Sequence, residues 1–145
     1  MELVGLKKCT DWFRVVDFKS LTDPTGLVAR KEVVVSLDQY PYDFGLGPNP
    51  REPRFNNRVS KRIAQTLEAG EERPNFHLLN RGITVVAKDI RYDNKNQRVR
   101  ITLGETDEEE RYFGILDGGN TNARINQWRE ALPEDEAGPL LTNTY

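Results

Sequence analysis

The segment Gly114–Arg124, GILDGGNTNAR, constrains the fold of this chain more than any other. Its apolar start predicts a strand that ends at Asp117, and two glycines then lead into a helix expected from Asn120 to about Leu132. A strand that turns into a helix on Gly-Gly brings backbone N–H groups and the positive end of the helix dipole to a sheet edge, which suits a phosphate or another anion. Asp117 at the tip suits a metal, a ribose hydroxyl or a base, and it equally suits a plain turn cap. The segment therefore predicts where a site lies before it predicts its chemistry.

A second segment, Asn80-Arg81-Gly82-Ile83-Thr84, stands where a loop leads into a strand. Gly82 is expected in a backbone conformation that other residues avoid. Asn80 can form a hydrogen bond within a turn or to a ligand, and the Arg81 guanidinium can form paired hydrogen bonds to a carboxylate or a phosphate. The alternative is an ordinary turn that feeds a strand, with Arg81 in solvent.

The stretch Arg51–Arg62 is the one concentrated positive segment of a chain whose formal charge is −2. A helix is predicted from an Asn56 or Asn57 cap to about Ala69, with Gly70 at its end. Helical spacing assigns a buried face to Val59, Ile63, Thr66 and Leu67. The basic side chains are suited to a phosphate backbone, or are simply solvated; they are Arg51, Arg54, Arg58, Lys61 and Arg62.

The remaining pattern predicts a mixed α+β domain with a mixed or largely antiparallel sheet, a β-meander and two main helices. At 145 residues, the chain is expected to form a single domain, 1–145. The strand at 82–88 is expected to form a hairpin with the alternating strand at 97–103, through a turn at 92–96. Further strands are expected at 12–18, 32–37 and 112–116, and LLTNTY at the end of the chain looks like the start of another.

Several kinds of site are excluded by composition. One cysteine, Cys9, allows neither an internal disulfide nor a cysteine-based zinc site, and one histidine, His77, allows no multi-histidine centre. His77, between Phe76 and Leu78, is expected to be packed or half-buried rather than catalytic. No run of 18 apolar residues occurs, so we expect no membrane contact and a cytoplasmic location. Aromatic side chains are expected to pack rather than to stack on bases: Trp12, Tyr40, Tyr42 and Trp128.

Four segments taken in order resemble the AIPR family, the abortive-infection phage-resistance proteins. They are Asn49–Glu52 (NPRE), Asn56–Glu68 (NNRVSKRIAQTLE), Pro74–Ala87 (PNFHLLNRGITVVA) and Ile115–Ile125 (ILDGGNTNARI). Three residues depart from the family pattern: Arg81 and Asp117 stand where an Asn is common, and Asn120 where a Gln is common. The turn at Asp117 is also more distantly similar to the ParB/sulfiredoxin-like and DGQHR turns, although Asn120 and Thr121 replace the His-Arg pair of those proteins.

The resemblance implies a role in bacterial antiphage defence and an N-terminal part of a longer protein. The leading hypothesis is a nucleic-acid- or nucleotide-binding domain whose pocket is formed by two segments, with the basic segment at its rim. The pocket residues would be Asn80, Arg81, Gly82, Thr84, Asp117, Gly118, Gly119, Asn120 and Thr121.

Two alternatives belong to other classes. One is a nuclease or nucleotide hydrolase that uses Asp117 and Mg²⁺. The other is a regulatory or scaffolding module that forms a homo-oligomer or binds a partner protein through a C-terminal region beyond this chain.

Overall fold

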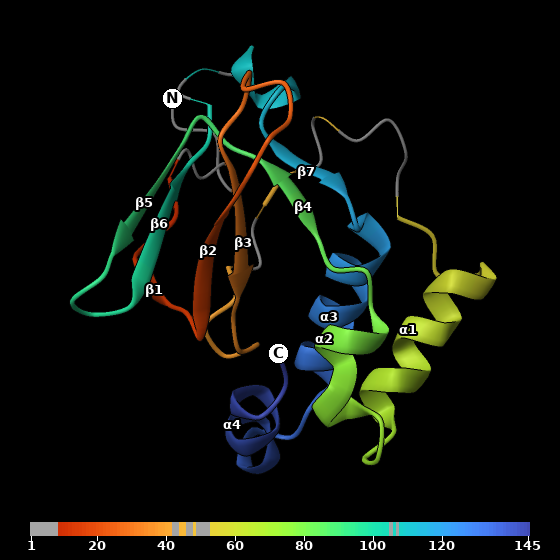
Figure 1. Ribbon diagram of the computed structural model, residues 1–145. Coiled ribbons are helices and arrows are strands. Elements are labelled where there is room, and N and C mark those ends of the chain that lie inside the picture. Colours follow the sequence, from red (N-terminus) through yellow and green to blue (C-terminus); the bar gives the residue numbers. More distant parts are fainter. Residues whose placement is uncertain (1–8, 42–43, 46–47, 49–52, 105, 107) are drawn as a thin grey trace.

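The computed structural model describes residues 9–41, 44–45, 48, 53–104, 106 and 108–145. The strands and helices form a mixed α+β fold, and every strand pair is antiparallel, which confirms the predicted fold class (Figure 1). The strands are β1 (Phe13–Arg14), β2 (Asp17–Leu21), β3 (Arg30–Val34), β4 (Thr84–Val86), β5 (Asp89–Asp93), β6 (Arg98–Thr102) and β7 (Gly114–Asp117). The helices are α1 (Arg58–Glu68), α2 (Phe76–Leu79), α3 (Gly119–Ala131) and α4 (Glu134–Thr142), with short 3₁₀ turns η1 (Arg73–Asn75) and η2 (Glu109–Arg111).

Three small sheets share one hydrophobic core with the helices. The sheets are β1-β6-β5, β2-β3 and β4-β7, and the helices gather on one side of them (Figure 1). Val99 of β6, Ile115 of β7 and Leu67 of α1 are fully buried where these layers meet. Ile125 of α3 is buried in the same core and Trp128 packs against it, so the helix that follows the Gly-Gly turn is anchored to the core.

Helix α1 forms where its sequence predicts it. The Asn57 side chain accepts a hydrogen bond from the Ser60 amide at 2.8 Å, a regular N-cap, and Ala69 ends the helix. Ile63, Thr66 and Leu67 are buried as expected. The expectation for Val59 is wrong: it is 64% exposed, because Ser60 occupies the buried position of the first turn against α3.

The predicted hairpin and meander are corrected by the strand pairing. Strand β6 pairs with β5, so residues 92–93 lie in a strand, and the turn follows them and includes Gln97 at φ 50°. Strand β4 pairs with β7, which divides the expected meander between two sheets. The reason lies in burial: Ile90 and Tyr92 of β5 supply the inward residues opposite Ile101 and Val99.

The predicted strand at 12–18 divides into β1 and β2 at Val15 and Val16. The Val15 amide donates to the Gln97 carbonyl at 2.9 Å, whereas the Val16 amide donates to the Val34 carbonyl at 2.7 Å. The chain therefore passes from one sheet to another at this point.

The C-terminal expectation is wrong. Residues 134–142 form α4 instead of a loop and a new strand. Acidic residues occupy the first turn of α4, where their negative charge interacts favourably with the positive end of the helix dipole. Leu141 of the same helix is buried in the core. None of the described helices is long and apolar enough to span a bilayer.

Candidate functional site

The two segments singled out in the sequence lie side by side. Thr84 and Asp117 are register partners at the end of the β4-β7 pair, next to an irregularity between Thr84 and Val85. The backbones are in direct contact, since a Cβ on Gly118 would come within 2.6 Å of the Gly82 carbonyl oxygen and 2.9 Å of the Ile83 Cα. Gly82 and Gly118 both have a left-handed backbone, with φ of 83° and 89°.

A side-chain contact joins the segments a second time. The Asn80 Nδ2 donates to Thr121 Oγ1 at 3.1 Å, and the Asn80 Oδ1 accepts from the Gly82 amide at 2.8 Å. Thr121 is only 5% exposed. Asn80 and Thr121 thus hold the two segments together, and Thr84 and Asp117 are exposed beside this contact.

Helix α3 begins at this junction. Gly118 is its N-cap residue, and no described side chain caps the first turn. Instead, the Asn120 Oδ1 turns away from the helix and accepts a hydrogen bond from the Arg54 amide at 2.7 Å. The first-turn N–H groups of a 13-residue helix therefore lie directly beside the segment that leads into α1.

Arg124, one turn after Asn120, is the residue that the sequence reasoning missed. Its Nε donates to Ser60 Oγ at 2.7 Å, its Nη2 donates to the Phe55 carbonyl at 2.5 Å, and its guanidinium stacks over the Phe55 ring. Ser60 is completely buried. The i, i+4 spacing of Asn120 and Arg124 is the signal for a shared helix face, but it does not say what this face contacts.

The described part of the basic segment runs from Pro53 into helix α1, and the Arg54 amide contacts Asn120. Arg54, Arg58, Lys61 and Arg62 are exposed, and Arg62 forms an ion pair with Glu72 at 3.3 Å. A surface depression of about 360 Å³ is lined by Arg54, Phe55, Asn56 and Asn57. Arg51, the fifth basic residue, lies outside the described residues, as does Tyr42.

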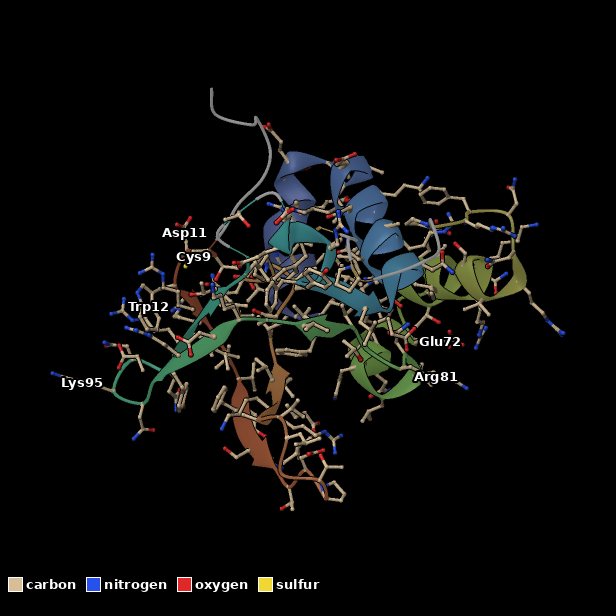
Figure 2. The ribbon with its side chains drawn as sticks, turned by 90° about the horizontal axis from the view of Figure 1, so that it is seen from above. Cys9, Asp11, Trp12, Glu72, Arg81 and Lys95 are labelled. Atoms are coloured by element: carbon tan, nitrogen blue, oxygen red, sulfur yellow. The ribbon has the colours of Figure 1, made fainter. Side chains whose placement is uncertain are left out.

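Arg81 and His77 both lie at the surface, and the expectation of a packed or half-buried side chain is wrong for His77. Arg81 is exposed at the periphery of the molecule, at the end away from Trp12 and Lys95 (Figure 2). His77 is exposed rather than packed, with its ring centre 6.0 Å from the ring centre of Tyr145 in an edge-to-face arrangement. It is displaced to the surface because Phe76 fills the buried position of the short helix α2.

The carboxylates of β5 lie in another sheet from Asp117 and have cationic partners. Asp89 pairs with Arg91 at 3.2 Å and Asp93 with Arg98 at 2.8 Å. Among the described residues, no three His, Cys, Asp or Glu side chains gather closely enough to hold a metal ion. Asp117 and Thr84 are exposed polar residues beside the start of α3.

The sequence comparisons agree with the resemblance drawn from the motifs. No match was found among curated proteins or solved structures. A family model described as AIPR protein matches residues 46–138, which contain α1, the segment 80–84 and the start of α3. This match supports the AIPR resemblance alone, and the likeness to ParB-like turns stays a prediction. Because the match spans well over half of the chain, the protein belongs to the AIPR family, the abortive-infection phage-resistance proteins.

Proposed function

We propose that this AIPR protein acts in antiphage defence by binding the phosphates of a nucleic acid or a nucleotide at the start of α3. One observation carries the proposal: the hydrogen bond from the Arg54 amide to Asn120 holds this segment against the first turn of α3, which no described side chain caps. A helix N-terminus attracts anions, and the adjacent cations extend the attraction over neighbouring phosphates.

Charge on the basic segment is available for a ligand. Arg58 and Lys61 are exposed on α1, and neither has an ion-pair partner among the described residues. Arg54 is exposed beside the depression. Contacts of this kind are independent of base sequence and weaken with salt, since each neutralised phosphate contributes about 0.9 to the slope of log K against log[salt] on duplex DNA.

The test is fluorescence anisotropy with labelled duplex DNA, single-stranded DNA, RNA and a nucleotide at low salt. We expect Arg58→Gln combined with Lys61→Gln to weaken duplex binding and to reduce the salt slope by about two. Lys19→Gln removes an exposed cation from β2 and is the control that leaves affinity unchanged. Absence of binding to every probe at low salt would refute the proposal.

The enzymatic alternative rests on the exposed Asp117 carboxylate, which lies opposite Thr84 at the start of α3. In this case Asp117→Asn abolishes Mg²⁺-dependent turnover of DNA, RNA or nucleotide but spares binding. An unchanged rate in this variant would exclude Asp117 as the catalytic group.

A further inference from the structure

We propose that the solvent-facing side of the β1-β6-β5 sheet binds a single-stranded nucleic acid, at a surface separate from the start of α3. This surface, here called the arginine face, comprises Arg14, Arg91, Arg98, Arg100 and Trp12. Trp12, on this face, lies at one end of the molecule (Figure 2). Arg81, in the segment that contacts the start of α3, lies at the other end. The inference therefore stands independently of the proposed function.

Strand register gathers the arginines on one side of the sheet. Along β6, Val99 and Ile101 are buried, so Arg98 and Arg100 point outward. Cross-strand partners share a face, and the partners of these two residues are Arg14 of β1 and Arg91 of β5. Two rows of guanidinium groups result, about 7 Å apart along the strands.

The charge of this face is only partly neutralised. Asp93 pairs with Arg98 and Asp89 with Arg91, whereas Arg14 and Arg100 have no carboxylate partner among the described residues. Arg100 Nε instead donates to the Cys9 sulfur at 3.0 Å. Arg91 lies directly opposite Arg100, so two positive charges face each other across the strands. Such a pair destabilises a sheet unless an anion lies between the charges.

Trp12 adds an aromatic surface to the same face. Trp12 is 37% exposed, and its ring centre lies 4.8 Å from the Arg98 guanidinium. Aromatic rings and arginine planes stack on unpaired bases, while guanidinium groups bind phosphate in a bidentate manner.

These features favour a flexible strand over other anions. A single phosphate reaches one row of guanidinium groups, whereas a chain of phosphates meets both rows. Bases already stacked inside a duplex cannot reach the indole, so a single strand is the ligand that uses the whole face.

The experiment measures anisotropy of labelled single-stranded DNA, single-stranded RNA of the same sequence, and the corresponding duplex. Arg14→Gln combined with Arg100→Gln leaves both aspartate pairs intact, and we expect it to weaken single-strand binding about fivefold and to lower the salt slope by about 1.4. Trp12→Phe keeps an aromatic ring at this position, and we expect it to reduce quenching of tryptophan fluorescence by the strand. Loss of affinity for either polymer supports the proposal.

Two controls separate this inference from the proposed function. Lys19→Gln with Arg30→Gln removes the same charge from the β2-β3 hairpin, and thermal unfolding verifies that each variant is folded. If Arg58→Gln with Lys61→Gln weakens single-strand binding and the Arg14/Arg100 variant does not, the arginine face is not a binding surface, and the site at α3 stands. If neither pair of substitutions changes affinity, or if the duplex binds more tightly than the single strand to the arginine face, the inference is overturned.

Discussion

Gly118 is the residue whose backbone brings the two site segments together. A Cβ here combines a left-handed φ of 89° with contacts of 2.6 and 2.9 Å to the backbone of the other segment. We expect Gly118→Ala to lower the free energy of unfolding by about 2–4 kcal/mol, measured by urea denaturation. Gly82→Ala has the same kind of φ but open space, so its cost should be limited to backbone strain of about 1 kcal/mol.

Gly138 of α4 provides the matched control, since a Cβ there has open space and no left-handed φ. Gly138→Ala should be neutral or slightly stabilising, because alanine is the better helix former. Equal effects of Gly118→Ala and Gly138→Ala would show that the close approach of the two segments does not exist.

Asp93 is the residue from which a pH dependence follows. Hydrogen bonds from Asn96, and then the Arg98 guanidinium, lower the pKa of its carboxyl below the ordinary value of 3.8. A lowered pKa means that the charged form favours the folded state, so this stabilisation is present above pH 3.8 and is lost as the pH falls through the folded-state pKa. We expect Asp93→Asn to reduce the urea midpoint at pH 6, with the difference from the wild type disappearing toward pH 2. A difference that grows on acidification would contradict this assignment.

At the scale of elements, α3 connects both halves of the site. Asn80 contacts its first turn, and Arg124 reaches the α1 side through Ser60 and the Phe55 carbonyl. We expect Arg124→Ala to lower the free energy of unfolding by about 1–3 kcal/mol, because Ser60 is buried and loses a charged donor. Arg58→Ala, an exposed residue of α1, is the control that stays within about 0.5 kcal/mol. Retained stability in the Arg124 variant would show that α1 docks on α3 by apolar packing alone.

The elements also show what the sequence can predict. The cap at Asn57, the buried positions Ile63 and Leu67 and the Gly-Gly start of α3 are local signals, and all were confirmed. Strand pairing is not local: whether β4 joins β6 or β7 depends on which strand fills the space beside Val99 and Ile101. The proximity of the segment 80–84 to the start of α3 was predicted from the chemistry of their side chains, and the contact between Asn80 and Thr121 shows it. The Arg124 contacts depend on how α1 packs against α3, which no local sequence pattern indicates.

At the scale of the whole molecule, the chain has a net charge of −2 but carries two positively charged surfaces at separate places. One adjoins α1 and the start of α3, and the other covers the outer side of β1-β6-β5. Asp89 and Asp93 neutralise part of the second surface and Glu72 part of the first, and further acidic residues lie elsewhere, including the first turn of α4. Overall charge therefore does not predict the binding behaviour of this domain, because the Debye length at physiological salt is about 8 Å and each surface acts locally.

If both proposed surfaces bind phosphates, the length of a strand decides how many of them it engages. Short single strands should occupy one surface at a time, so either pair of substitutions leaves the other surface available. Combining Arg58→Gln and Lys61→Gln with Arg14→Gln and Arg100→Gln should therefore lower affinity by more than the product of the separate losses. A strand long enough to span both surfaces should bind more tightly than either short strand, because its second contact is intramolecular. Anisotropy across a series of strand lengths measures this gain, and either pair of substitutions alone should abolish it. A gain that persists when the arginine face is neutralised would mean that long strands extend along the α3 surface instead.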